Sequence, residues 1–296
     1  MRLLPFLIYA LGVFAGAALL AFPAWSLAQA AGFGPVPFNK LCFRLLQACA
    51  LIGLWPLMRF FGLTSASDWG FGAGKVPAAR PRALAWGFLG GILLLFLIVA
   101  ILLAAGARTF RPDFSWQAGV LLDTAMKAAL AGLVIALVEE TWFRGALQRA
   151  IETGFGAVAA IGVTALLYAL VHFVRPDVEV PADAVDWLSG VTVIAGAFGR
   201  FADAGIVDSL AALFAVGLLL ALVRHHTGRI WECIGLHAGF VVVIRLARRT
   251  TAVQPDAPHA WLAGSFDGVI GWLALAVFAV AALVYWAARV RGSAHA

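Results

Sequence analysis

The stretch LVIALVEETWFRGALQR, residues 133–149, carries two adjacent carboxylates, Glu139 and Glu140, inside a run of mostly apolar side chains. An ionised side chain at bilayer depth costs roughly 2.5–3.5 kcal/mol on insertion scales, so it needs a partner, a wet cavity or a function. Glu140 and Arg144 are four residues apart and can pair on one face of a helix. Glu139 is rotated by about 100° from Glu140, which leaves it without an obvious partner in its own helix.

The composition of the whole chain is that of a membrane protein. Of its 296 residues, 63% are hydrophobic and only 12% are charged, and the mean hydropathy is +0.96. This composition excludes a soluble globular protein, because the chain has too few polar residues to cover a surface in contact with water. Repeated apolar runs of about 18 residues or more predict an all-α, polytopic membrane helix bundle with about eight transmembrane helices.

The formal charge of +6 at pH 7 does not indicate a nucleic-acid partner. The Lys and Arg residues lie in short clusters that flank apolar runs, so they indicate membrane topology instead of a phosphate-binding surface. The three cysteines, Cys42, Cys49 and Cys233, have no CxxC spacing and are expected to be packing residues. The expected surroundings of the chain are therefore a lipid bilayer, with no nucleic acid.

The apolar runs are expected to form transmembrane helices along the whole chain. N-terminal transmembrane helices are expected within residues 1–120, and a C-terminal transmembrane helix and tail within residues 247–296. The triplet Ala28-Gln29-Ala30 resembles a signal-peptidase site, but the length of the first apolar run favours an uncleaved span. The spans are expected within 1–30 and at about 38–63, 83–105, 128–152, 157–174, 206–223, 230–246 and 269–288.

Eight spans place both termini on one side of the membrane. The basic loop after the second span, the RHHTGR link at 224–229 and the basic tail lie on that side, which the positive-inside rule makes cytoplasmic. The cluster Arg245, Arg248 and Arg249 lies on the other side and breaks the rule. The prediction is a multi-pass protein of the cell (inner or plasma) membrane with cytoplasmic termini. The apolar stretch 187–198, inside an acidic connector, is too short to span.

A break at residues 153–156, TGFG, joins the glutamate-bearing span to the next one. Glu139 lies about sixteen residues before the middle of this break, and His172 lies about sixteen residues after it. In an antiparallel hairpin with a rise of ~1.5 Å per residue, both side chains reach the same depth, about 24 Å from the turn. The spacing therefore permits Glu139 and His172 to meet.

Glu139, Glu140, His172 and His237 are the polar positions inside apolar helices that could carry chemistry. Such a set can be a proton relay, a coupling-ion site, a structural ion pair or a catalyst. One catalytic mechanism is zinc hydrolysis with Glu139, His172 and His237 as ligands. The other is metal-free, with a desolvated glutamate that takes a proton from a water held against a histidine. The HExxH signature is absent, so the residues leave both mechanisms open.

The same residues resemble motifs of the CPBP family, the CAAX-prenyl-protease and bacteriocin-processing (Abi-type) intramembrane proteases. EETWFR at 139–144 matches the family's EExxxR motif, and YALVH at 168–172 resembles its second motif, an aromatic residue followed four places later by His. His237 takes the place of the histidine in the third motif. The resemblance covers roughly residues 121–246, which makes that segment a CPBP-like protease core.

The resemblance implies an eight-helix membrane bundle that hydrolyses peptide bonds within the bilayer or at its edge. Glu139 and His172 would activate a water, Glu140 and Arg144 would brace the site as an ion pair, and His237 would help to stabilise the oxyanion. A glutamate-type mechanism without metal is implied, so no cofactor is expected and zinc is the alternative. The expected partners are a membrane-anchored protein or peptide substrate and the lipid bilayer.

Val241 departs from the family pattern, which usually has Asn or Asp four residues after the third-motif histidine. Loss of one oxyanion donor typically costs on the order of 10²–10³ in rate, and Arg245 is a candidate replacement. Val241 therefore favours a second hypothesis, a non-catalytic membrane scaffold or immunity protein that binds a membrane peptide. A transporter is a third hypothesis, but the inverted repeats and broken helices typical of transporters are not clear in the sequence.

Overall fold

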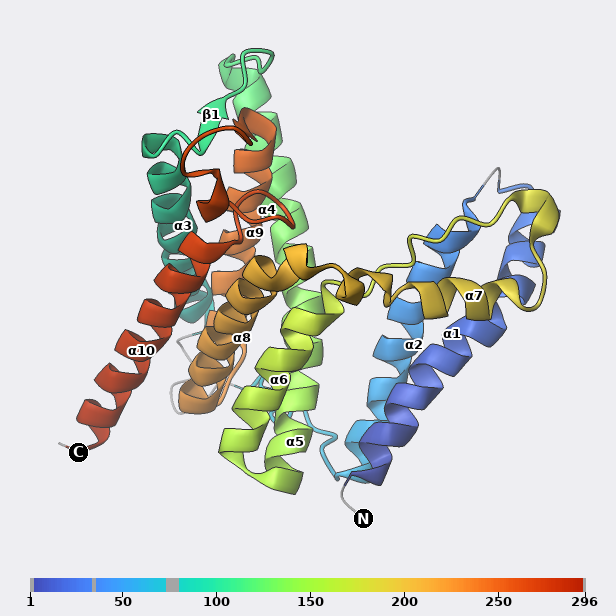
Figure 1. Ribbon diagram of the computed structural model, residues 1–296. Coiled ribbons are helices and arrows are strands. Elements are labelled where there is room, and N and C mark those ends of the chain that lie inside the picture. The colour runs from blue at the N-terminus through green and yellow to red at the C-terminus, as the bar shows by residue number, and fades with distance from the viewer. Residues whose placement is uncertain (1–2, 34–35, 73–79, 295–296) are drawn as a thin grey trace. The chain divides into compact units, whose positions relative to one another are not determined.

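The chain is mostly helical in a computed structural model, which describes residues 3–33, 36–72 and 80–294 (Figure 1). The helices are α1 Leu4–Ala30, α2 Phe38–Phe60, α3 Arg80–Ala104, α4 Ala118–Glu140, the π-helical segment η2 Thr141–Leu147, α5 Gln148–Phe155, α6 Ala157–Val171, α7 Ser189–Gly196, α8 Val207–Thr227, α9 Trp231–Thr250 and α10 Trp272–Ala294. The strands are β1 Arg108–Phe110 and β2 Thr251–Val253, and 3₁₀ turns occur at η3 Ala182–Ala184, η4 Gly199–Ala202, η5 Ala204–Ile206 and η6 Ala260–Leu262.

Several helices are long and apolar enough to cross a membrane. Among the described residues there are six: Leu4–Ala30, Phe38–Phe60, Arg80–Ala104, Ala118–Phe155, Ala204–Thr227 and Trp272–Arg291. α6 is apolar but has 15 residues, about 22 Å of helix, and α9 carries three arginines in its second half. The prediction of an all-α membrane bundle is confirmed, and the number of eight spans stays a prediction.

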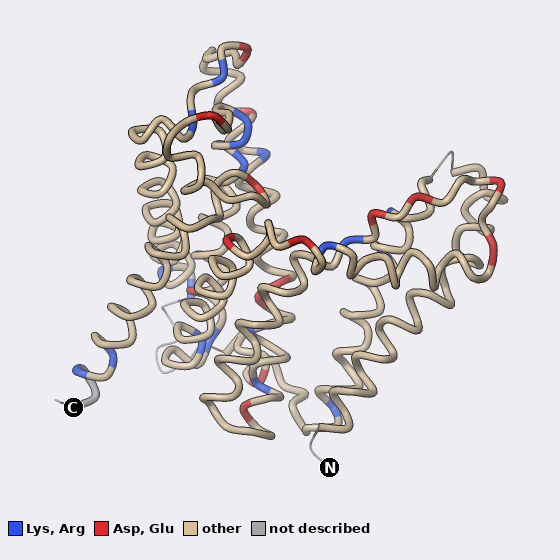
Figure 2. The backbone as a smooth tube through the Cα atoms, viewed as in Figure 1, with Lys and Arg blue, Asp and Glu red and all other residues tan. Residues whose placement is uncertain are grey.

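The surfaces of the helices fit a lipid environment. On α4, Leu130, Leu133, Val134 and Leu137 are between 43% and 67% exposed. Figure 2 shows that Lys, Arg, Asp and Glu gather mainly in the connections and near the helix ends. Helices with apolar outer faces and charged ends are typical of membrane-spanning bundles, in which backbone polar groups are satisfied inside each helix.

The chain forms two compact units, residues 1–64 with 170–204 and residues 65–169 with 205–296. The predicted division into three segments follows their expected roles and stays a prediction. In the first unit α1 packs against α2, where the Tyr9 hydroxyl donates to the Ala50 carbonyl oxygen at 2.9 Å. The short apolar stretch 187–198 forms α7, and Gly190 of α7 lies against the backbone of Ala18 in α1.

In the second unit, glycines spaced four residues apart bring α3 and α9 into close contact. Gly87 and Gly91 of α3 face the backbone of α9, and Gly235 and Gly239 of α9 face the backbone of α3. A Cβ atom at any of these four positions would collide with backbone atoms of the other helix. Paired small residues at this spacing allow membrane helices to approach closely. The packing fixes the rotation of α9 about its axis.

A neighbouring face of α9 packs on α4 through a second row of small residues. Ala128, Gly132 and Ala136 are buried along α4 at the same four-residue spacing. A Cβ atom on Gly132 would lie 2.9 Å from the carbonyl oxygen of Ala238 in α9. Since Ala238 follows His237, this contact holds His237 next to the end of α4.

The remaining helices of the second unit pack on α8. Gly217 of α8 lies against the backbone of Ala165 in α6, and α10 runs beside α8 (Figure 1). The break predicted at 153–156 is confirmed, because α5 ends at Phe155 and Gly156 has a φ of +85°. A backbone at positive φ favours glycine, which has no Cβ to clash there.

The connector after α3 forms a two-stranded ribbon with the segment after α9. β1 pairs antiparallel with β2. Arg108, 3% exposed, anchors this ribbon. Its Nε donates to Thr251 Oγ1 at 2.8 Å, its Nη1 donates to the Gly268 carbonyl oxygen at 2.6 Å, and its Nη2 donates to the carbonyl oxygens of Ala247 and Thr251 at 3.2 and 3.0 Å. Neutral oxygens therefore accept hydrogen bonds from all three guanidinium nitrogens.

Candidate active site

The candidate site lies where α4 continues into the π-helical segment Thr141–Leu147. α4, this segment and α5 follow one another without interruption from residue 118 to residue 155. Glu139 and Glu140 are the last two residues of α4, and Arg144 lies in the middle of the π-helical segment. π-Helical turns inside α-helices are frequent at functional sites. The predicted motif residues therefore coincide with a local irregularity of the helix.

Glu140 and Arg144 form a buried ion pair, as their spacing predicts. Arg144 Nη1 donates to Glu140 Oε1 at 3.2 Å, and both side chains are 0% exposed. Arg144 Nη2 donates to the Gly217 carbonyl oxygen of α8 at 3.3 Å. The guanidinium carbon also lies 4.4 Å from the centre of the Tyr168 ring of α6. These contacts offset part of the cost of burying two charges and join three helices at one point.

His237 lies beside both glutamates, although 97 residues separate it from Glu140 in the sequence. Its Nδ1 is 2.8 Å from Glu140 Oε1, and its Nε2 is 3.8 Å from Glu139 Oε2. The Tyr168 ring packs edge-on against the imidazole, with 6.0 Å between ring centres. Sequence reasoning assigned His237 to the oxyanion and did not predict its contact with Glu140. The signal that could have found it is the buried Glu140, which needs more than one donor.

The two carboxylates differ in access. The side chain of Glu139 is 30% exposed, whereas that of Glu140 is 0% exposed. Because the carboxylate of Glu140 accepts a hydrogen bond from Arg144, the hydrogen on Nδ1 of His237 points to Glu140. In a neutral imidazole, Nε2 then turns its lone pair toward Glu139. The lone pair on Nε2 and the carboxylate of Glu139 repel each other until one of them carries a proton. The two groups are therefore arranged to share or transfer a proton.

Four buried polar atoms around the ion pair make no hydrogen bond to any described residue. They are Glu139 Oε2, Glu140 Oε2, Arg144 Nε and Gln148 Oε1. Buried polar atoms in folded proteins are nearly always hydrogen-bonded, to protein or to ordered water. A cluster of such atoms at one place indicates a position where water or a ligand binds.

His172 lies directly after α6, in the part of the chain that belongs to the first unit. Glu139, Glu140, Arg144 and His237 all belong to the second unit, where the structure brings them together. The pairing of His172 with Glu139, which the hairpin spacing permits, stays a prediction.

Val241 lies one helical turn beyond His237 on α9. A Cβ atom on Gly132 of α4 would lie 3.5 Å from the Cβ of Val241, so this side chain faces α4. Arg245, the predicted replacement donor, is exposed one further turn along α9. Its role in stabilising an oxyanion stays a prediction.

The zinc alternative requires Glu139, His172 and His237 to share one ion. Within residues 3–33, 36–72 and 80–294, no group of three or more His, Cys, Asp or Glu side chains is arranged to hold a metal ion. Since Nδ1 of His237 contacts Glu140, Nε2 is the nitrogen that remains for a metal. The proposed ligands come from both units, so zinc binding stays a prediction.

Comparison with known protein families finds a match for the central part of the chain. Residues 121–243 match the family model described as type II CAAX prenyl endopeptidase Rce1-like. The matched segment is less than half of the chain and contains Glu139, Glu140, Arg144, His172 and His237. The match confirms the resemblance to CAAX-type proteases and supports a hydrolase, a CAAX-type intramembrane endopeptidase. No curated protein and no solved structure matches the chain.

Proposed function

We propose that this chain hydrolyses a peptide bond of a membrane-anchored protein or peptide, with a water activated by Glu139 and His172. The observation that carries the proposal is the position of His237, with one ring nitrogen 2.8 Å from the buried Glu140 and the other 3.8 Å from the accessible Glu139. A carboxylate that is partly exposed, poorly hydrogen-bonded and next to an imidazole suits a general base. The Rce1-like match over the same residues supports this reading.

In the proposed reaction, Glu139 takes a proton from the water, and the water oxygen forms a bond to the carbonyl carbon of the substrate. His172 holds the water on its other side, as the family resemblance implies. The proton on Glu139 then passes to the leaving nitrogen as the C–N bond breaks. The second proton of the water passes from the new carboxyl group to the amine, so the products are a carboxylate and an ammonium group, and no oxidant or other co-reactant is needed. Metal-free general acid–base catalysis of this kind contributes typically 10²–10⁴ in rate.

The buried pair of Glu140 and Arg144 would fix the catalytic histidine. Glu140 holds Nδ1 of His237, so Nε2 is the nitrogen that can carry a proton toward the reacting carbonyl. A protonated Nε2 would donate a hydrogen bond to the oxyanion as it forms. Preorganised donors of this kind stabilise developing charge because they need no reorganisation during the reaction.

A cleavage assay in liposomes tests the proposal. Candidate membrane-anchored peptides are incubated with the wild-type chain, with Glu139→Gln and with His172→Ala, each with and without a zinc chelator. We expect wild-type cleavage to resist the chelator and both variants to lose about 10³-fold in rate while they keep their helical content. Glu179→Gln, which changes an exposed glutamate outside the site, is the matched control. Full activity in folded Glu139→Gln would overturn the mechanism, and chelator-sensitive cleavage restored by zinc would favour the metal mechanism.

The second candidate function is a non-catalytic scaffold or immunity protein that binds a membrane peptide at the same place. The observation that favours it is Val241, which stands where the related proteases usually have an amide or acid. It predicts that Glu139→Gln and His172→Ala keep the cellular phenotype of the wild type. For either function we propose a location in the inner or plasma membrane with both termini cytoplasmic, which fusions of a reporter enzyme to each terminus would test.

A further inference from the structure

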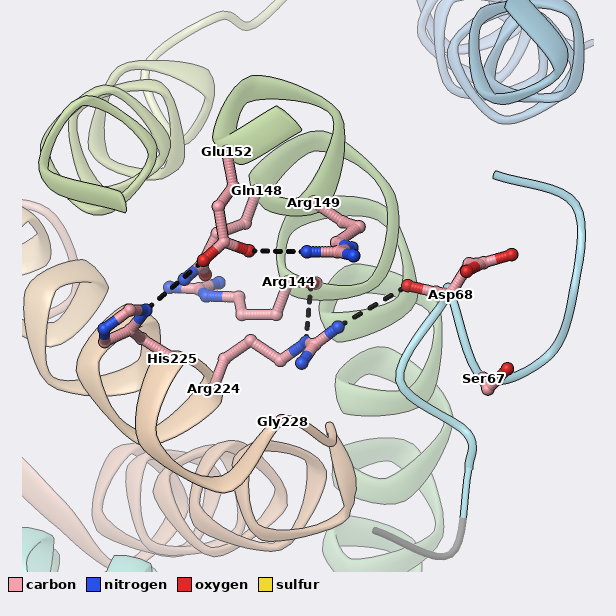
Figure 3. Close-up of a pocket in the computed structure, with 9 residues that line it drawn as sticks. All are labelled: Ser67, Asp68, Arg144, Gln148, Arg149, Glu152, Arg224, His225 and Gly228. Carbon is pink, nitrogen blue, oxygen red and sulfur yellow. Dashed lines mark hydrogen bonds and ion pairs between the residues drawn. The ribbon is translucent and has the colours of Figure 1, made fainter. Parts of the chain in front are cut away.

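A polar cavity of about 320 Å³ lies in the second unit beside Arg144, and neither of the two motif glutamates lines it. Six of its lining residues matter here, namely Arg144, Gln148, Arg149, Glu152, Arg224 and His225 (Figure 3). They come from the π-helical segment, α5 and the C-terminal end of α8. The proposed reaction uses none of them directly, and Arg144 is the residue that the cavity shares with the candidate site.

Arg224 gives this cavity its positive charge. The residue is 8% exposed. Its Nε donates to the Arg144 carbonyl oxygen at 3.1 Å, and its Nη2 donates to the Asp68 carbonyl oxygen at 3.5 Å. Both acceptors are neutral backbone groups, and within the described chain no carboxylate forms an ion pair with Arg224. Unlike Nε and Nη2, Nη1 of Arg224 makes no hydrogen bond to the described residues, so a bound anion would complete this buried guanidinium.

The two carboxylates near the cavity are already engaged. Asp68 Oδ2 accepts hydrogen bonds from the backbone nitrogen of Ser65 at 2.8 Å and from the Ser65 hydroxyl at 2.6 Å. In Figure 3 its side chain points away from Arg224. Glu152 pairs with Arg149 at 3.2 Å and with His225 at 3.4 Å. The charge of Arg224 therefore remains for a ligand.

Two residues that line the cavity each have a buried side-chain atom that makes no hydrogen bond to the described residues. These atoms are Arg144 Nε, a donor, and Gln148 Oε1, an acceptor. Arg144 is 0% exposed and Gln148 is 3% exposed. A ligand that fits both atoms carries a negatively charged oxygen and, next to it, a hydroxyl group. A phosphate group beside a hydroxyl has both features, and arginines bind its oxygens well.

The length of α8 would place the cavity near the phosphate groups of a membrane that this helix spans. α8 has 21 residues, about 31 Å of helix, which matches the thickness of the hydrocarbon core. Arg224 and His225 lie in its last turn, so in a membrane spanned by α8 they would lie near the headgroups of one leaflet. The same end of α8 continues into the RHHTGR link, which the charge distribution assigns to the cytoplasmic side. Basic pockets at helix ends on that side are suited to anionic headgroups.

We propose that the cavity formed by Arg144, Gln148, Arg149 and Arg224 binds a phosphate group, with a neighbouring hydroxyl on Gln148 Oε1. The phosphate comes from an anionic phospholipid headgroup or from free phosphate, and the two sources can be separated by experiment. Because Arg144 also holds Glu140, an occupied cavity would steady the candidate site. The binding itself does not depend on the proposed peptidase reaction.

Ligand titrations of the full chain in a neutral detergent test this proposal. The probes are short-chain phosphatidylglycerol, short-chain phosphatidylcholine and inorganic phosphate, and the readout is the dissociation constant. We expect phosphatidylglycerol to bind at least about tenfold more tightly than phosphatidylcholine, which has no headgroup hydroxyl and no net charge. Inorganic phosphate that binds as tightly as phosphatidylglycerol would assign the site to free phosphate. If none of the three probes binds, the proposal is wrong.

Substitutions of residues that line the cavity test whether phosphatidylglycerol binds there. Arg224→Gln should weaken phosphatidylglycerol binding about tenfold, because it removes one charge-assisted contact. Arg149→Gln should weaken phosphatidylglycerol binding by a smaller factor. Because the Arg149 side chain is 41% exposed, this variant is expected to fold, and it tests the proposal even if Arg224→Gln does not fold. Arg249→Gln is the matched control, since Arg249 is an exposed cation of the same unit outside the cavity. An equal effect of Arg149→Gln and Arg249→Gln would show that the lipid responds to net charge only, which overturns the proposal.

Discussion

Two buried arginines of the second unit, Arg108 and Arg144, are satisfied in opposite ways. Arg108 has no ion-pair partner among the described residues, yet each of its three guanidinium nitrogens donates a hydrogen bond to a neutral oxygen. Arg144 has an ion-pair partner in Glu140, yet its Nε makes no hydrogen bond to the described chain. All three guanidinium nitrogens of Arg108 are hydrogen-bonded although it has no counter-charge in the described chain, and we call this arginine complete. Arg144 has a counter-charge but one nitrogen without a hydrogen bond to the described residues, and we call it incomplete.

The difference separates a structural arginine from a functional one. Around Arg108 each of the three guanidinium nitrogens donates a hydrogen bond, which closes the ribbon of β1 and β2 onto the end of α9. Around Arg144 the unused atoms extend to Glu139, Glu140 and Gln148. Since an unused buried polar atom costs free energy, it persists in a folded protein where water or a ligand completes it. Incomplete hydrogen bonding therefore points to the site more sharply than the presence of a buried charge.

The largest effect on stability is expected at the incomplete arginine. Glu140→Gln keeps the shape of the side chain but leaves Arg144 as a buried charge without a counter-charge. Loss of one partner of a buried pair costs about 3–5 kcal/mol. We expect a fall of this order in the free energy of unfolding, measured by circular dichroism during denaturant titration in mixed micelles.

The adjacent carboxylate provides the control for this measurement. Glu139→Gln also removes one charge, but Glu139 is 30% exposed and forms no ion pair with an arginine among the described residues. Its effect on stability should stay below about 1 kcal/mol, a value typical of partly exposed charges. Equal destabilisation by the two substitutions would remove the distinction between a bracing and a reactive glutamate.

The complete arginine should affect stability without affecting the chemistry. Arg108→Met preserves much of the side-chain length but leaves the carbonyl oxygens of Gly268 and Ala247 without this donor. Each unsatisfied buried group costs about 1–3 kcal/mol, so we expect a loss of about 3 kcal/mol in the free energy of unfolding. The rate of peptide cleavage per folded molecule should remain that of the wild type. A variant that is stable but inactive would show that Arg108 belongs to the functional site.

The fold class and the ion pair could be predicted because both depend on local patterns. Apolar runs determine where helices form in a membrane, and a spacing of four residues determines which side chains can pair. The ribbon around Arg108 could not be predicted, because its strands have three residues each and lie 143 residues apart at the contact of Arg108 with Thr251. Short strands leave no periodic signal in a sequence.

The sequence predicts candidate residues for the site, but it does not predict the geometry around Glu139, Glu140 and His237. EETWFR and the two histidines follow from motifs, whereas the π-helical segment has no signal in residue type. The contact of His237 with Glu140 depends on how α9 is rotated, and that rotation is set by glycines of α3 and α9. The contact of His237 with Glu140 therefore depends on packing between helices that are distant in sequence, and local residue spacing does not predict it.

Val241→Asn tests whether the incomplete site can be improved. The substitution places an amide one turn beyond His237, where related proteases usually have a donor. An established oxyanion donor contributes on the order of 10²–10³ in rate, but a new one lacks preorganised neighbours, so we expect a gain of about tenfold in cleavage. Val241→Ile is the apolar control and should leave the rate within about twofold. A rate that falls with Asn would mean that another group already occupies the oxyanion position.

The smallest effect is expected at Asp186, a surface carboxylate with one oxygen that accepts three hydrogen bonds. Its Oδ1 accepts hydrogen bonds from the Ser189 hydroxyl at 2.8 Å, the Ser189 backbone nitrogen at 2.8 Å and the Leu188 backbone nitrogen at 2.9 Å. The Ser189 hydroxyl, followed by its backbone N–H, holds the pKa of Asp186 below its usual range. A carboxylate whose pKa is lowered by folding stabilises the fold above its unfolded pKa of about 3.9, and this contribution is lost as the pH falls through the lower folded value.

Hydrogen exchange of the backbone amides of α7 measures this contribution. After correction for intrinsic exchange rates, protection at Ser189–Gly196 should fall a few-fold between about pH 5 and pH 2.5 in the wild type. Asp186→Asn should remove this pH dependence and show low protection throughout, because the amide oxygen is a weaker acceptor than a carboxylate. Full exposure should keep the effect far below that of Arg108→Met. A large loss of protection in Asp186→Asn would mean that hydrogen bonding at the surface matters as much as in the interior. Burial would then not explain the contrast between Arg108 and Arg144.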